Sequence, residues 1–274
     1  MVAISLAFRL RYLVCLLLAL GFVQQSAWGQ TARPELVEFK SGDLDLKGFL
    51  WKPSGDGPFR AVLWNHGSRK TVGAIDSVAP YFVRKGYVFF VPHRRGQGES
   101  PGAYIREETN KAESRGERGQ LLVNSHDIQL ADQLAGLEYL KSLTIVDRNR
   151  IAVMGNSFGG IQTMLAVERG PGYRVAVNCS GAAETWSSFS SLRSRLTEAA
   201  GNAKMPVFFF QAENDYDLRP NRVLSDEMRK AGKPVEAKVY PAFGTGPRDG
   251  HSFCVRGTKT WGPDVLKFIE AYLK

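Results

Sequence analysis

The chain has 274 residues, of which 43% are hydrophobic and 23% charged, and its formal net charge is +9 at pH 7. This composition excludes disordered, fibrous and disulfide-dense scaffolds, and the length suits one large domain with a full hydrophobic core. The basic residues are scattered along the chain and form no run, so we expect no binding of nucleic acid.

The N-terminus has the features of a secretory signal peptide. Arg9 and Arg11 precede a continuous apolar run, residues 12–23, and Ala27 and Gly29 supply the small residues of a cleavage site. The apolar run is only about 12 residues long, whereas about 20 are needed to span a bilayer. A retained membrane anchor is therefore the less favoured alternative.

Cleavage after this segment gives a signal peptide of residues 1–29 and a mature domain of residues 30–274, with a charge of +7. We expect the mature protein to be exported, either periplasmic or secreted, with no membrane span. Cys15 lies inside the apolar run and leaves with the signal peptide. Cys179 and Cys254 remain, and in an oxidising compartment they form either a disulfide or two separate buried thiols.

The mature chain alternates short apolar runs with amphipathic segments. Strands are expected at 36–39, 44–51, 61–64, 87–91, 151–154, 175–177, 207–210 and 235–240. Helices are expected at 77–85, 124–140, 159–169, 221–231 and 262–273. Residues 96–122 are polar and rich in charges and glycines, and we interpret them as a surface excursion.

This alternation predicts an α/β fold with a mostly parallel sheet of about eight strands, covered by helices on both faces. The first two strands form a hairpin that adds antiparallel strands at one edge. Active sites in such sheets lie at the carboxyl ends of the strands, which is where the polar motifs of this chain are found.

The segment 155–159 fits the pattern G-x-S-x-G, directly after the strand at 151–154 and directly before a helix. This is the setting of a nucleophile elbow, in which a strained strand-to-helix turn pushes the serine hydroxyl into the cleft. The alternative is a loop serine that only caps the helix. The strand before it and the helix after it favour Ser157 as a catalytic nucleophile.

A serine hydroxyl needs a base to become a useful nucleophile at neutral pH. In hydrolases of this type the serine comes first along the chain, the acid next and the histidine last. His251 is the one histidine after Ser157, and it lies in a segment expected to be a loop between the last strand and the last helix. The chain order therefore selects His251.

The acid is expected in the segment 213–217, which follows the strand at 207–210. A carboxylate there would hold the histidine ring in one tautomer and stabilise the imidazolium. Asp215 is our choice and Asp217 the alternative, with Glu213 and Asp249 as weaker candidates.

An oxyanion hole requires backbone N–H groups aimed at the developing negative charge. One should come from Phe158, directly after the nucleophile. The other should come from Ser68, because the preceding His66–Gly67 turn lets the backbone approach closely. Arg69 and Lys70 follow this turn. We consider two alternative roles for them: solvated charges on the surface, or binding of an anionic group of the substrate.

Several motifs together resemble those of known proteins. The segments 147–160, 93–100, 211–220 and 250–253 look like the elbow, the Arg-Gly-x-Gly-x-Ser segment, the acid loop and the histidine loop of dienelactone-hydrolase-like and prolyl-oligopeptidase-like α/β-hydrolases. The resemblance covers nearly the whole mature chain and implies the α/β-hydrolase fold with a serine, histidine and aspartate triad. It says little about the substrate.

Two departures from these families narrow the range of expected substrates and activities. Dienelactone hydrolase proper uses a cysteine nucleophile, so dienelactone is a poor candidate substrate for a chain with Ser157. Prolyl-oligopeptidase-like peptidases usually carry an N-terminal propeller, and no such domain fits here. Residues 182–205 are too few for a large cap, but Trp186 could line an apolar substrate pocket in a small lid or simply pack against the body.

The leading functional hypothesis is a carboxylic-ester hydrolase, a carboxylesterase-like serine hydrolase that acts on a small-molecule ester through an acyl-enzyme. It needs no metal or organic cofactor. The alternatives are a small aminopeptidase or amidase with the same machinery, and a non-catalytic binding protein on the same scaffold.

Overall fold

The computed structural model describes residues 33–274. The predicted signal peptide, its cleavage site and Cys15 lie outside the described residues. Within residues 33–274, no helix is long and apolar enough to cross a membrane.

The described chain is built on one sheet of eight strands in the order β1-β2-β4-β3-β5-β6-β7-β8. The strands are β1 (Glu35–Ser41), β2 (Leu44–Trp51), β3 (Phe59–Asn65), β4 (Tyr87–Pro92), β5 (Val146–Asn156), β6 (Val175–Cys179), β7 (Val207–Ala212) and β8 (Val235–Tyr240). β1 pairs with β2 and β2 with β4 in antiparallel fashion, and all later neighbours are parallel. The predicted strand count, the parallel sheet and the antiparallel edge hairpin are confirmed.

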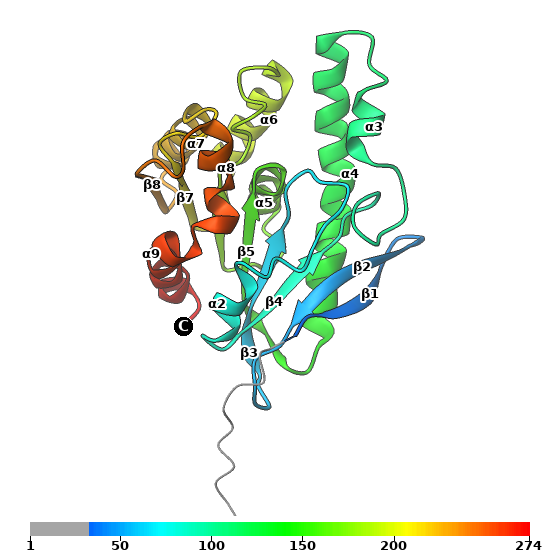
Figure 1. Cartoon of the computed structure of the whole chain (residues 1–274), viewed down its shortest axis with the longest axis vertical. Helices are drawn as coiled ribbons and strands as arrows, with labels where there is room; N and C mark the ends of the chain where they lie inside the picture. The colour runs from blue at the N-terminus through cyan, green and yellow to red at the C-terminus, as the bar shows by residue number, and fades with distance from the viewer. Residues whose placement is uncertain (1–32) are drawn as a thin grey trace, which may run out of the picture. The chain divides into compact units, whose positions relative to one another are not determined.

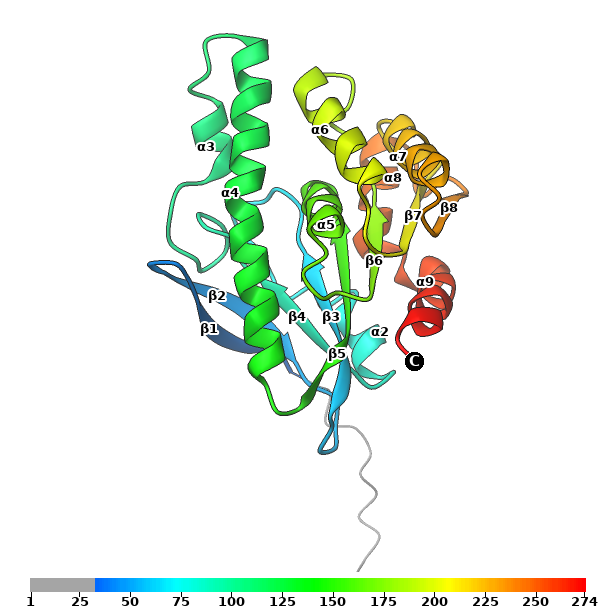
Figure 2. The same cartoon turned by 180° about the vertical axis from the view of Figure 1, so that it is seen from behind.

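Helices cover both faces of the sheet (Figures 1 and 2). The helices are α2 (Ala79–Val83), α3 (Ile105–Thr109), α4 (Arg115–Ser142), α5 (Phe158–Arg169), α6 (Ser190–Gly201), α7 (Arg219–Lys230), α8 (Pro247–Arg256) and α9 (Thr258–Tyr272). α2, α8 and α9 lie on one side, while α4, α5, α6 and α7 lie on the other.

The continuous apolar runs of the central strands follow from this layering. Successive side chains of a strand point to opposite faces, so both faces need apolar residues. In β5, Ile151 and Val153 pack in the core under α4 and α5, whereas Ala152 and Met154 pack in the core under α2, α8 and α9. All four are buried.

Residues 96–122, expected to be a surface excursion, are largely exposed but include helical structure that the sequence analysis did not assign. The segment contains α3 and the first two turns of α4. Ser114 caps α4 by accepting a hydrogen bond from the backbone N–H of Glu117 at 3.1 Å. A serine followed three residues later by a glutamate is a helix-start signal, which the high charge density of the segment obscured.

The segment that carries His251 is also more regular than expected, because it forms helix α8 rather than a loop. Pro247 occupies its first turn and Asp249 places a negative charge there, and both favour a helix start. Between β6 and β7 the structure has α6 and short connections, so there is no large cap in the described chain, as predicted.

Candidate active site

Ser157 lies on a strained turn between β5 and α5. Its backbone angles are φ 55° and ψ −120°, a conformation that residues with a side chain rarely adopt. The backbone N–H of Ser157 donates to the carbonyl of Cys179 at the end of β6, at 2.9 Å. Strain of this kind collects at functional sites, and here it belongs to the serine of the G-x-S-x-G motif.

The glycines around Ser157 are required by close packing of the backbone. A Cβ atom on Gly155 would lie 2.2 Å from the carbonyl oxygen of Gly159. A Cβ atom on Gly159 would lie 1.9 Å from the carbonyl oxygen of Asn65 in β3. Glycine at 155 therefore lets the turn close tightly on itself, and glycine at 159 lets it sit directly against β3.

His251 and Asp215 form a buried pair. Nδ1 of His251 lies 2.8 Å from Oδ1 of Asp215, whose side chain is 0% exposed. The ring of Tyr216 packs edge-on against the His251 ring, with centroids 5.3 Å apart. Nε2 of His251 is buried and makes no hydrogen bond within residues 33–274, and His251 and Ser157 line the same cavity.

The surroundings of His251 set its basicity. Burial lowers the pKa of His251, but the hydrogen bond to Asp215 and the charges of Asp215 and Glu184 together outweigh burial. The pKa is therefore raised above its ordinary value of 6.5. The carboxylate makes the imidazole a stronger base and fixes the proton on Nδ1 in the neutral ring.

Of the alternative acids, Glu213 is exposed, and Asp217 and Asp249 have other partners. Both carboxylate oxygens of Asp217 accept hydrogen bonds from the guanidinium of Arg219, at 2.6 to 3.0 Å. Asp249 accepts from Thr245 and pairs with Arg256. Of the acids considered from the sequence, the structure brings Asp215 to the histidine.

Asn214, which sequence reasoning missed, joins the acid loop to the chain before α8. Its Nδ2 donates to the carbonyls of Phe243 and Gly246 at 3.0 and 3.1 Å, and its Oδ1 accepts from the Phe243 N–H at 2.9 Å. A Cβ atom on Gly250 would lie 2.6 Å from the carbonyl of Asn214. This close approach brings α8, and with it His251, against the acid loop.

Ser68 and Phe158, the two expected oxyanion donors, line one cavity together with Ser157. Phe158 is the first residue of α5, so its N–H has no acceptor within the helix. Ser68 uses its carbonyl to accept from Tyr104 and its Oγ to accept from Arg106, at 3.1 and 3.0 Å. A Cβ atom on Gly67 would lie 3.6 Å from Cβ of Ser157, so the turn before Ser68 approaches the nucleophile closely.

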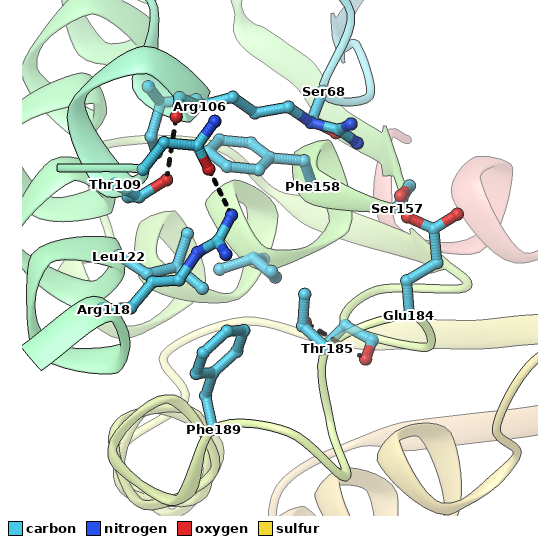
Figure 3. A pocket seen from close by; sticks show the side chains of 14 residues that line it. Ser68, Arg106, Thr109, Arg118, Leu122, Ser157, Phe158, Glu184, Thr185 and Phe189 are labelled. Carbon is cyan, nitrogen blue, oxygen red and sulfur yellow. Dashed lines mark hydrogen bonds between the residues drawn. The ribbon is translucent and has the colours of Figure 1, made fainter. Parts of the chain in front are cut away.

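Two cavities meet at Ser157. The first, about 370 Å³, has an apolar floor that includes Ile105, Leu122, Phe158, Ile161 and Phe189. Ser68, Phe158 and Ser157 lie together at one side of it, and Glu184 points toward Ser157 (Figure 3). Arg106 and Arg118 also line it, and sequence reasoning missed them because they lie among the many charged residues of the segment 96–122.

The second cavity, about 580 Å³, is lined by more polar groups, among them Arg69, Glu184, Arg248 and His251. Arg69 thus lies in the cleft, as the sequence allowed. Trp186 does not line either cavity: it is 4% exposed and packs in the core. It is Phe189, three residues later, that reaches the first cavity, so Trp186 is corrected from a substrate contact to a core residue.

Cys179 and Cys254 form a disulfide, with Cα atoms 5.8 Å apart. Cys179 ends β6 and its carbonyl accepts from the Ser157 N–H, while Cys254 lies three residues after His251 on α8. The disulfide therefore links the strand beside the nucleophile turn to the helix of the histidine. Within residues 33–274, no cluster of three or more His, Cys, Asp or Glu side chains is arranged to hold a metal ion.

Comparison with known proteins identifies the family of the chain. The dienelactone hydrolase family model matches residues 46–264. An acyltransferase of Aspergillus calidoustus, drtE, is 28% identical over 207 residues, which are 72% of this chain and 62% of the relative. The chain spans less than two thirds of that relative's length.

Solved structures with a similar fold include a peptidase and an esterase. Pyrococcus horikoshii acylaminoacyl peptidase superposes with a TM-score of 0.66 at 21% identity, over 89% of this chain and 42% of the peptidase. Pyrococcus furiosus esterase Pf2001 superposes with a TM-score of 0.64 at 18% identity, over 89% of this chain and 92% of the esterase. At such low identity these likenesses show the fold, which is that of the α/β-hydrolases.

Proposed function

Since this chain belongs to the dienelactone hydrolase family, we propose that it is a serine hydrolase that cleaves a carboxylic ester through an acyl-enzyme. The observation that carries the proposal is the buried pair of Asp215 and His251, 2.8 Å apart, which opens onto the same cavity as Ser157. A base that is oriented by a carboxylate and shares a cavity with a serine on a strained turn is the arrangement that can activate a hydroxyl.

In the proposed mechanism, Nε2 of His251 takes the proton of Ser157 as Oγ attacks the ester carbonyl. Asp215 stabilises the imidazolium that forms. The tetrahedral intermediate collapses when His251 gives its proton to the leaving alcohol, and the acyl group stays on Ser157. Water then attacks the acyl carbonyl while His251 takes one of its protons. The bond between the acyl group and Oγ of Ser157 breaks, His251 returns the proton to Oγ, and the acid is released.

The backbone N–H groups of Ser68 and Phe158 hold the negative oxygen in both tetrahedral intermediates. Each such donor contributes about 3 kcal/mol to stabilisation of the transition state, because it is fixed before the charge develops. The N-terminus of α5 adds a favourable dipole at the same place.

The two cavities suggest how a substrate lies. The first has an apolar floor and suits the acyl group, while the second, which contains His251, suits the alcohol that His251 must protonate. This assignment places the leaving group on the side of its proton donor.

A second candidate function is hydrolysis of an amino-terminal peptide or amide bond. The observation in its favour is Glu184, an exposed carboxylate that lines both cavities beside Ser157 (Figure 3). A carboxylate beside the nucleophile could bind the amino group of an aminoacyl substrate.

A substrate panel tests the proposal and separates the two candidates. The mature protein is assayed with p-nitrophenyl acetate and butyrate and with aminoacyl p-nitroanilides, with Ser157→Ala as the control. We expect ester hydrolysis that is lost in Ser157→Ala, together with labelling of Ser157 by a fluorophosphonate probe. Preferential cleavage of the anilides would favour the peptidase, and folded protein without hydrolysis or labelling would reject both.

We also propose that the enzyme works outside the reducing cytoplasm. The disulfide between Cys179 and Cys254 supports this, because disulfides persist mainly in oxidising compartments. Cell fractionation with an antibody against residues 33–274 tests it, and recovery of the full-length chain in the cytoplasm would reject it.

A further inference from the structure

Arg94 is a buried cation that follows the end of β4 and has no role in the proposed triad. Only 1% of the surface of Arg94 is exposed to solvent, and the residue lies between the His66–Gly67 turn and helix α4. A buried guanidinium is costly unless it is well satisfied, so its partners indicate what it does.

Those partners include the backbone that carries the proposed oxyanion donors. Nη2 of Arg94 donates to the carbonyl of His66 at 2.8 Å and reaches the carbonyl of Gly67 at 3.4 Å. The Gly67 carbonyl belongs to the same peptide group as the N–H of Ser68. Nδ1 of His66 lies 2.8 Å from the same carbonyl oxygen, and the Arg69 N–H donates to it at 3.0 Å. Arg94 is therefore one of three groups that hold this carbonyl, and with it the opposite direction of the Ser68 N–H.

Arg94 also contacts the residue that carries the second proposed donor. Its guanidinium carbon lies 5.0 Å from the centroid of the Phe158 ring, within the range of a cation–π interaction. The other neighbour of this ring is His126, stacked at a centroid distance of 3.8 Å. Phe158 is thus held at the start of α5 by its side chain, while its N–H stays free of helical bonding.

The charge of Arg94 is not neutralised by any group in contact with it. Besides the two carbonyls, Nη2 lies 3.1 Å from Nδ1 of His66, and Nε donates to the side-chain oxygens of Gln97 and Gln129 at 3.2 and 3.1 Å. All three of these side chains are neutral. The carboxylate of Asp132 is engaged by Arg95 and Ser41 instead. The charge of Asp132 still acts on Arg94, but Arg95 offsets that charge by pairing with Asp132.

The neighbouring histidines reflect the positive charge of Arg94. Burial and then the charge of Arg94 lower the pKa of His66 and the pKa of His126 well below the ordinary value. Burial lowers the pKa of Arg94 itself to about 9, which leaves the guanidinium charged at neutral pH.

We propose that Arg94 is a positioning residue of the oxyanion hole, which orients the Ser68 and Phe158 amides and adds a positive charge behind them. The inference rests on the proposed acyl-transfer function. It explains why an unpaired cation is kept in the core at this point: the charge is placed where negative charge develops on the substrate oxygen.

The test compares wild-type protein with Arg94→Met in ester hydrolysis and in binding of a trifluoromethyl ketone. Such a ketone adds to the serine and forms a hemiketal whose oxyanion occupies the oxyanion hole, whereas the matching methyl ketone reports ground-state binding. We expect kcat to fall about 10- to 100-fold, which is less than the fall caused by removing a direct oxyanion donor. KM should stay within about twofold of the wild-type value. Affinity for the trifluoromethyl ketone should fall by the same factor as kcat, and affinity for the methyl ketone should stay unchanged.

Three further variants keep the outcome interpretable. Arg95→Gln is the matched control, because Arg95 binds Asp132 and does not touch the oxyanion turn; it should leave kcat within about twofold. Arg94→Lys should recover part of kcat. If Arg94→Met does not fold, Gln129→Glu keeps the guanidinium and places a carboxylate against Nε, and it should lower kcat and trifluoromethyl ketone affinity together.

Wild-type kcat in a folded Arg94→Met or Gln129→Glu variant would overturn the inference, as would a fall in kcat without a matching loss of trifluoromethyl ketone affinity. A change confined to KM would do the same. Failure of the proposed function looks different: there the wild-type protein itself hydrolyses neither esters nor anilides and does not bind the trifluoromethyl ketone.

Discussion

Oδ1 of Asp215 lies 2.8 Å from Nδ1 of His251, although the two residues are 36 positions apart in the chain. Asp215 follows the end of β7 and is fully buried, whereas His251 is held on α8. The contact depends on Gly250, which lets α8 approach the backbone of Asn214. The acid and the base are thus joined by helix packing rather than by a local turn.

Replacing this acid should cost most of the activity. We expect Asp215→Asn to lower kcat by about 10³- to 10⁴-fold with little change in KM, because the amide no longer stabilises the imidazolium or the correct tautomer. Asp217→Asn is the matched control and should retain kcat within about twofold, since Asp217 pairs with Arg219. Steady-state kinetics on the preferred ester decide this, and equal losses in both variants would contradict the assignment.

The pH profile should report His251. The base must be neutral to accept the serine proton, so kcat/KM should fall as the pH drops below the raised pKa of His251. The charge of Glu184 helps to raise that pKa, so Glu184→Gln should lower it and move the acid limb of the profile to lower pH. Asp226→Asn, on α7 beside Arg229, is the control and should leave the limb in place. A shift to higher pH in Glu184→Gln would contradict the prediction.

The disulfide should contribute strongly to stability. It joins Cys179 and Cys254 across a sequence separation of 75 residues, and loop-closure entropy for that length corresponds to about 4 kcal/mol. We expect the double variant Cys179→Ala/Cys254→Ala to lose about that free energy of unfolding in urea titrations. Reducing agent should destabilise the wild-type protein and leave the double variant unaffected, and a double variant as stable as wild type would rule this out.

Backbone packing at the nucleophile turn should tolerate no side chain at Gly159. The Cβ atom of Gly159→Ala would lie 1.9 Å from the carbonyl oxygen of Asn65, so the turn must distort. We expect loss of hydrolysis and a lower Tm. Gly116→Ala is the control: its Cβ meets nothing within 4 Å, and in a helix it should raise stability by up to about 1 kcal/mol. An active Gly159→Ala variant with unchanged Tm would contradict the packing argument.

The sequence by itself determined the fold class and the positions of the strands along the chain. The apolar runs of the central strands must face two helical layers, and these runs are visible without coordinates. It also singled out Ser157 from a local strand-turn-helix motif, and His251 from the order of residues along the chain. These inferences use periodicity, local motifs and chain order, which are properties of the linear chain.

Tertiary structure alone decided which carboxylate meets His251, whether the cysteines pair, and which side chains line the cavities. Asp215 and Asp217 are two residues apart in one loop, and only the packing of α8 distinguishes them. Trp186 and Phe189 are likewise both aromatic, yet one enters the core and the other the cavity. Arg94 gives no signal in the sequence, because its partners come from the turn after β3, from α4 and from α5. Such contacts depend on distances between segments remote in the chain, and these distances are fixed only when the layers pack.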